Sequence, residues 1–101
     1  MSDYIVPEGV TEIASRAFDG CRGLTSITLP KSLRKIGTRA FVGCFDLTEI
    51  IIPEGVTEIA SHAFDGCTWL TSITLPKSLR KIGEYAFGRY HECKNLSEVH
   101  I

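Results

Sequence analysis

Fourteen consecutive residues of this chain occur twice, letter for letter. The stretch LTSITLPKSLRKIG covers residues 24–37 and returns at residues 70–83, an offset of 46. A looser version at residues 47–60 lies between the copies, so the repeating unit is 23 residues long. A fixed period of about 20 to 50 residues indicates a protein that stacks one structural unit. The chain is therefore predicted to form a repeat solenoid.

Each unit combines a strand with a return segment. The units are marked by four prolines, Pro7, Pro30, Pro53 and Pro76. Residues 25–29, 48–52, 71–75 and 97–101 alternate in polarity and are rich in Thr, Ile, Val and Leu, which predicts short strands with one buried face. The chain also opens on a predicted strand, because three of its first residues match the buried positions of Leu24, Ile27 and Leu29: Met1, Tyr4 and Val6.

The return segments are predicted to hold a second extended piece and one helical turn. The extended pieces lie around residues 11–13 and 34–36. The turn carries the repeated Ala-Phe pair, with a helix N-cap residue before it (Ser15, Thr38, Ser61) and a glycine after it (Gly20, Gly43, Gly66). The expected fold is an α/β solenoid with parallel strands on one face, and helical turns and short extended pieces on the other.

The pattern LxxIxLPxxLxxIGxxAFxxCxxL resembles the BspA-like (Treponema-type) leucine-rich repeat family over essentially the whole chain. The resemblance implies a right-handed solenoid that binds other macromolecules, and it does not imply catalysis. We expect a single domain, residues 1–101, with units at 1–23, 24–46, 47–69 and 70–95 and a terminal strand at 96–101. The last unit departs from the pattern by three extra residues within 88–92.

Composition and motifs exclude several functions. A net charge of -1 argues against a nucleic-acid or anionic-membrane partner. No run of 18 apolar residues occurs, and the first residues lack the features of a signal peptide, so we expect neither membrane insertion nor a signal peptide. No catalytic or nucleotide-binding motif occurs, so the chain is expected not to be an enzyme and to need no cofactor. His62 is expected to be solvated.

The four cysteines follow the repeat period and lack the short spacing of zinc ligands. We expect no metal site and a buried column of reduced thiols. A disulfide between neighbouring coils is the alternative, if the coils approach closely enough.

Charge alternates with the repeat on the return side. The residue after each proline runs Glu8, Lys31, Glu54, Lys77, and the residue before each isoleucine runs Glu12, Lys35, Glu58, Lys81. Stacking would set each acid between two bases on the convex side. Duplication of a two-unit block would leave the same pattern without a structural role.

Two sets of residues that vary between repeats are candidates for binding. Phe45 and Trp69 follow consecutive cysteines, which places them at one rim of adjacent coils, as anchors or as local packing. The outward positions of the strands form the second set, either a binding face or a featureless soluble one. Its candidate residues are Ile5, Thr28, Glu49, Ile51, Thr74, Glu98 and His100.

The resemblance implies a protein-interaction module like the surface adhesin repeats of bacteria and protists, with a host or cell-surface protein as partner and a cell-surface or secreted location. A structural or self-assembling scaffold without an external ligand is the alternative, because residues 7–42 and 53–88 agree at 30 of 36 positions. No end carries a capping motif, so we also expect end-to-end homo-association through the terminal strands.

Overall fold

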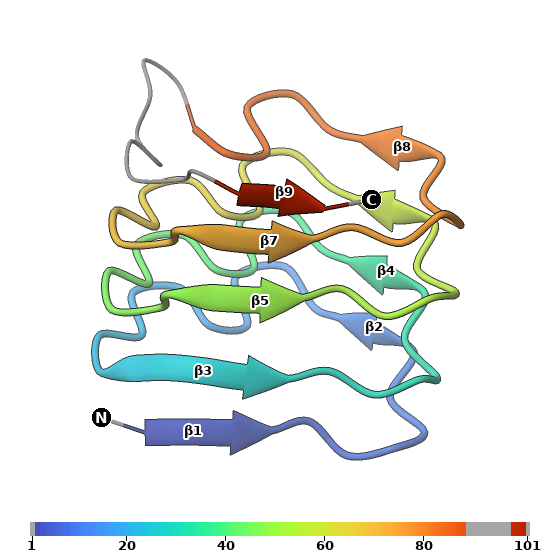
Figure 1. Cartoon of the computed structure of the whole chain (residues 1–101), viewed down its shortest axis with the longest axis horizontal. Helices are drawn as coiled ribbons and strands as arrows, with labels where there is room; N and C mark the ends of the chain where they lie inside the picture. Colours follow the sequence, from blue (N-terminus) through green and yellow to red (C-terminus); the bar gives the residue numbers. More distant parts are fainter. Residues whose placement is uncertain (1, 89–97, 101) are drawn as a thin grey trace.

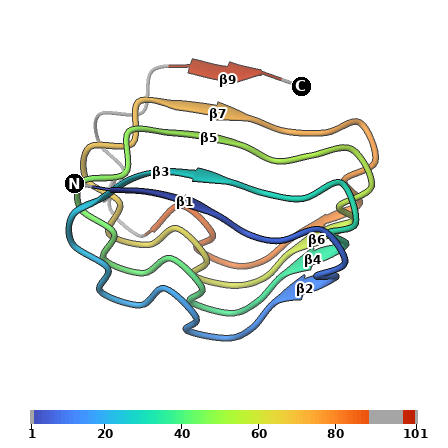
Figure 2. The same ribbon diagram turned by 90° about the horizontal axis from the view of Figure 1, so that it is seen from below.

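The chain winds into a stack of coils with one layer of strands on each side (Figure 1). The computed structural model describes residues 2–88 and 98–100. One layer, called here the odd-strand face, holds β1 (Ser2–Ile5), β3 (Leu24–Thr28), β5 (Glu49–Ile51), β7 (Ser72–Thr74) and β9 (Glu98–His100). The even-strand face holds β2 (Glu12–Ile13), β4 (Lys35–Ile36), β6 (Glu58–Ile59) and β8 (Lys81–Ile82). Figure 2 shows the two layers on opposite sides of the stack.

The strand register confirms one coil per repeat. All strand pairs are parallel, and Ile36 pairs with Ile59 on the next coil, which pairs in turn with Ile82. On the odd-strand face Ile73 follows Ile50 by one repeat, and Val99 pairs with Ile73. The last pairing spans the three extra residues, so the insertion leaves the register of the strand layer intact.

A column of phenylalanines fills the space between the layers. The rings of Phe18, Phe41, Phe64 and Phe87 stack nearly parallel, with centroid distances of 5.2, 5.2 and 5.7 Å. Phe41 and Phe64 are fully buried, together with Leu33, Leu47 and Leu70. Burying one such side chain contributes about 1.5–3 kcal/mol. Burial of like residues on successive coils is thus the main source of stability in this stack.

The predicted helical turns are not confirmed, because the described residues contain hydrogen-bonded turns and no helix. Alternate amides point to the next coil: Phe41 N–H donates to the Ala63 carbonyl at 2.8 Å, whereas Ala40 N–H donates back to Gly37 at 3.2 Å. In an α-helix each amide after the first turn donates to the carbonyl four residues before it, and successive amides point the same way along the axis. Arg39, in the middle of the turn, has a φ of 59°, which interrupts any right-handed helix. The solenoid is therefore described by strands and turns alone.

The end coils expose positions that are buried in the middle. Tyr4, predicted to be buried, is 46% exposed, although it pairs with Ile27 as expected. Ile82 is 48% exposed, whereas Ile36 and Ile59 are fully buried. The physical reason is that a terminal coil has a neighbouring coil on one side only. Met1 lies outside the described residues.

The strand layer of the odd-strand face is divided. β1 pairs with β3, and β5 pairs with β7 and β9, but β3 and β5 do not form a ladder. The two coils still touch at the start of these strands, where Thr48 N–H donates to the Thr25 carbonyl at 3.4 Å. On the even-strand face the four strands form one sheet. The division opens the odd-strand face in its middle.

Candidate protein-binding surface

The outward side chains of the odd-strand face form two columns. The register sets Asp3 beside Ser26 and Glu49 beside Ser72 in the first column. It sets Ile5 beside Thr28 and Ile51 beside Thr74 in the second. The backbone pairing continues from Ser72 to Glu98 and from Thr74 to His100. Five of the predicted strand-face residues thus lie on one surface: Ile5, Thr28, Glu49, Ile51 and Thr74.

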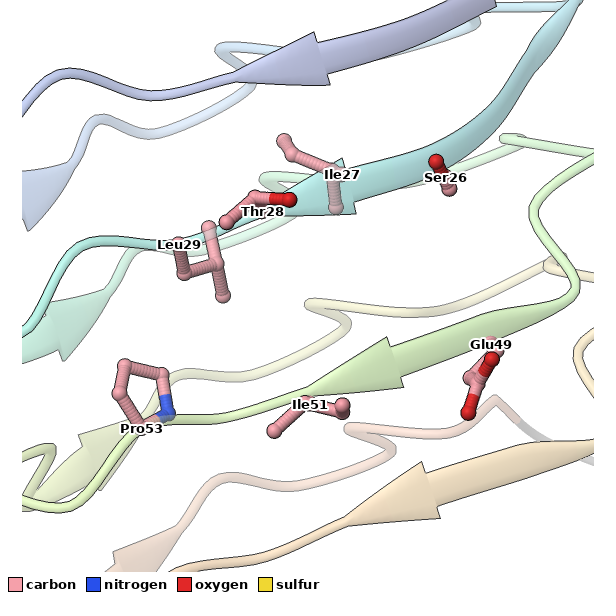
Figure 3. Close-up of a pocket in the computed structure, with 7 residues that line it drawn as sticks. All are labelled: Ser26, Ile27, Thr28, Leu29, Glu49, Ile51 and Pro53. Atoms are coloured by element: carbon pink, nitrogen blue, oxygen red, sulfur yellow. The ribbon is translucent and has the colours of Figure 1, made fainter.

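A groove runs where β3 and β5 separate. Its volume is about 310 Å³. Figure 3 shows its lining residues, which come from both strands and the segments after them: Ser26, Ile27, Thr28, Leu29, Glu49, Ile51 and Pro53. Three of the predicted binding residues (Thr28, Glu49, Ile51) are among them. The groove itself could not be found from the sequence, because its cause is a missing ladder between two strands whose sequences follow the repeat.

Two isoleucines project from this face into solvent. Ile51 is 59% exposed at the groove, and Ile5 is 72% exposed on β1. The remaining outward residues of the described middle strands are small and polar or acidic. One of them, Ser26, donates its hydroxyl to the Asp3 carboxylate at 2.6 Å. A flat surface with isolated apolar groups and short hydrogen-bonding side chains suits contact with a protein chain better than enclosure of a small molecule.

The rim aromatics lie at the entries to neighbouring strands. Phe45 precedes β5 and is 37% exposed, and the Arg22 guanidinium lies 4.9 Å from the centre of its ring. Trp69 precedes β7 and is 57% exposed. The ring contacts among the described residues do not join Phe45 to Trp69. Phe45 therefore takes part in local packing, and Trp69 is the more accessible of the two.

The cysteines of the described coils are free thiols packed in the core. Cys44 and Cys67 are fully buried, and Cys21 is half-buried. Each buried thiol donates to a phenylalanine carbonyl of the preceding coil, Cys44 to Phe18 at 3.1 Å and Cys67 to Phe41 at 3.2 Å. Burial raises the pKa of the Cys44 thiol to about 11. These thiols have a packing role. Cys93 lies outside the described residues.

His62 is less exposed than the sequence predicts. The residue was expected to be solvated, but its side chain is only 17% exposed. Its Nδ1 lies 2.8 Å from an Asp65 carboxylate oxygen, and the Tyr85 ring of the next coil lies 5.4 Å away. A left-handed φ of 59° turns the imidazole back over its own turn, where Tyr85 covers it. No feature of the sequence indicates this, because the repeat has arginine at the equivalent positions, and the Arg16 side chain is 61% exposed.

Over residues 2–88 and 98–100, no group of three or more His, Cys, Asp or Glu side chains is placed to hold a metal ion. In the same residues no helix has the length and apolar character needed to cross a membrane.

The stacked parallel strands, the buried leucine and phenylalanine columns and the open strand face define a leucine-rich-repeat solenoid. The BspA type leucine-rich repeat region, in six copies, matches residues 1–101 in a comparison with protein families. The chain belongs to this family. A search of curated proteins gives no match.

Solved structures support the assignment. A leucine-rich repeat protein from Bacteroides ovatus is 39% identical, with a TM-score of 0.89 over 98% of this chain. A leucine-rich repeat protein from T. pallidum is 27% identical, with a TM-score of 0.69 over 97% of this chain. The chain covers 24% of the Bacteroides protein and 68% of the T. pallidum protein.

Proposed function

We propose that this protein is a non-catalytic protein-interaction module that binds a protein ligand through the odd-strand face. The observation that carries the proposal is the exposed Ile51 beside a groove of about 310 Å³, on a flat strand layer whose described outward side chains are polar apart from Ile51 and Ile5. Solenoids use such extended faces to bind other proteins. The exposed Ile51 in the middle of the face supplies the apolar contact that such an interface needs.

We extend the proposal to an adhesin-like role at a cell surface or in secreted form, with a host or cell-surface protein as partner. The support is the family to which the chain belongs. Residues 1–101 are proposed to act as one domain. Trp69, more than half exposed at the entry to β7, is proposed to anchor the partner at the rim.

The test compares matched variants against a panel of purified matrix and host-surface proteins. Ile51→Lys places a charge beside the groove and should weaken binding of any ligand about tenfold or more, if Ile51 is an interface centre. Ile82→Lys is the control, because Ile82 is also an exposed isoleucine, on the opposite face. Equal binding by both variants contradicts the proposed face. Trp69→Ala, compared with Phe45→Ala, tests the rim in the same assay.

End-to-end self-assembly is a second candidate, and the apolar end of the stack favours it. Beside the exposed Ile82 lies a groove of about 260 Å³, lined by residues of the last described coil: Leu75, Pro76, Lys77, Leu79, Arg80 and Ile82. At the opposite end of the stack, Glu8 lies in the turn before β2 and Glu12 lies in β2, so a second copy would set acids against Lys77 and Lys81. In this case Ile82→Lys, and not Ile51→Lys, reduces the particle size measured by sedimentation.

A further inference from the structure

The charge on the odd-strand face has one sign. None of its five strands contains lysine or arginine, whereas Asp3 and Glu49 project from β1 and β5 and are exposed. The ion pairs of the described residues are Arg16–Asp19, Lys35–Glu58 and His62–Asp65, and none of them includes Asp3 or Glu49. The even-strand face, in contrast, alternates acids and bases from coil to coil. The odd-strand face therefore presents uncompensated negative charge to a partner.

Each acid has an exposed isoleucine two residues later on the same face. The pairs are Asp3 with Ile5 and Glu49 with Ile51. Residues two apart in a strand lie about 6.6 Å from each other along it. The two pairs are separated by β3, whose outward Ser26 and Thr28 are small, and by the groove that both of these residues line. The surface thus holds two acid–isoleucine pairs with a depression between them.

The distance between the two pairs indicates the secondary structure of the partner. Two steps between hydrogen-bonded strands amount to about 10 Å, and the missing ladder between β3 and β5 makes the distance between the two pairs at least that large. Seven residues of an α-helix rise about 10.5 Å and return to nearly the same side of the helix. Outward residues of an extended chain repeat about every 6.6 Å, which does not match. A helix lying across the strands would therefore meet both pairs with residues seven positions apart.

We infer that the ligand of the odd-strand face is a basic amphipathic helix, with Lys or Arg along one flank facing Asp3 and Glu49 and aliphatic side chains along the other flank facing Ile5 and Ile51. One aliphatic side chain between the two contacts would enter the groove between β3 and β5. This inference rests on the proposed function, and it adds the chemical class and the secondary structure of the partner. Helices of this kind dock into apolar grooves through anchors on one side.

The single tryptophan of the chain, Trp69, lies exposed at the rim of this face and provides a fluorescence signal for binding. The probe is a synthetic Lys/Leu peptide designed as a helix with lysines seven residues apart. Two control peptides accompany it, one with glutamates in place of the lysines and one with a central proline that prevents the helix. The inference predicts binding of the first peptide alone, weakening as salt is raised.

Two variants of the full-length chain test where the peptide binds, and a third serves as the control. Glu49→Gln should weaken binding of the basic peptide about twofold to fivefold, as expected for the loss of one exposed ion pair. It should also reduce the salt dependence of binding. Glu58→Gln is the matched control, because Glu58 lies on the opposite face and pairs with Lys35. Ile51→Lys should weaken binding about tenfold or more.

The possible results separate this inference from the proposed function. Equal binding of the acidic or the proline-containing peptide overturns the inference, and so does an unchanged affinity in Glu49→Gln and Ile51→Lys. If an acidic or extended protein ligand binds and is lost in Ile51→Lys, the proposed function stands and the basic-helix inference fails. If no ligand of any kind responds to Ile51→Lys, both fail.

Discussion

The buried thiols show how a single residue type is fitted to a stacked core. Cys44 and Cys67 each follow a phenylalanine turn and donate to a carbonyl of the coil before, so these thiols link neighbouring coils as well as filling space. The repeat period predicted the burial of Cys44 and Cys67, because equivalent positions stack. It could not predict the left-handed backbone at Arg16, Arg39, His62 and Tyr85, since these residues normally avoid that conformation.

Cys44 makes the stability of the fold sensitive to alkaline pH. Desolvation raises its pKa from 9.0 to about 11 in the folded chain, so the folded state keeps a proton that the unfolded state loses. The stabilising contribution is complete below pH 9 and is lost as the pH rises to about 11. The loss over this interval amounts to about 2–3 kcal/mol.

Cys44→Ser keeps a hydrogen-bond donor for the Phe18 carbonyl and removes the titration. Urea unfolding at several pH values should show a shallower decline for the serine variant between pH 9 and 11 than for the unchanged chain. Parallel declines would mean that Cys44 does not cause the pH dependence.

At the scale of elements, neighbouring coils approach each other closely at Gly37. Its N–H donates to the Ile13 carbonyl at 2.8 Å, and a Cβ placed on Gly37 would lie 2.6 Å from that oxygen and 2.8 Å from the Ser15 nitrogen. Both neighbours are backbone atoms and cannot rotate away. The glycine was visible in the repeated sequence, but its reason is a close contact between coils, which only the structure contains.

Gly37→Ala should therefore destabilise the fold by about 2–3 kcal/mol, at the upper end of overpacking effects. Gly20→Ala is the matched control: its φ of 70° disfavours alanine, but a Cβ there would meet nothing within 4 Å. The control should cost only about 1–2 kcal/mol. Urea midpoints measured side by side decide the point, and a Gly37 variant as stable as the Gly20 variant would contradict the close-contact argument.

The charge columns of the even-strand face make unequal contacts. Lys35 Nζ lies 4.0 Å from Glu58 Oε1, a contact between charged side chains. Glu54 instead accepts the backbone N–H of Lys77 at 3.1 Å, and Glu8 accepts that of Lys31 at 3.3 Å. The sequence predicted alternation correctly but could not tell a side-chain partner from a backbone one, because both lie at the same step of the stack.

A double-mutant cycle on Lys35 and Glu58, with glutamine replacing each, should give a coupling free energy of about 0.2–1 kcal/mol. The same cycle on Glu54 and Lys77 should be additive, because the Lys77 ammonium is not the group that Glu54 binds. Salt should reduce the first coupling. Equal coupling free energies in the two cycles would contradict this prediction, because they would show that the Lys77 side chain also interacts with Glu54.

At the scale of the whole molecule, the two layers differ in their number of strands. Five described strands lie on the odd-strand face and four on the even-strand face. If β2 of a second copy stacked on β8, its β1 would have to occupy the place of β9. While β9 is present, a second copy therefore cannot pair with the first in both strand layers at once. The period predicted the solenoid, its register and the extra strand on the odd-strand face, but the division between β3 and β5 and the groove depend on backbone geometry that the repeat does not encode.

Shortening the chain to residues 1–88 should remove the mismatch and strengthen end-to-end association. Four strands would then lie in each layer, and Glu8 and Glu12 of one copy would face Lys77 and Lys81 of the next while Ile82 became buried. Sedimentation should show larger, concentration-dependent particles for the shortened chain than for the full chain, with far-UV circular dichroism checking that it folds.

Lys77→Glu combined with Lys81→Glu sets like charges at the junction and should return the shortened chain to a monomer. Because a heterologous contact that does not close on itself produces open filaments, particles that grow without a fixed size fit this junction. A folded shortened chain that stays monomeric would instead place self-association outside these two ends.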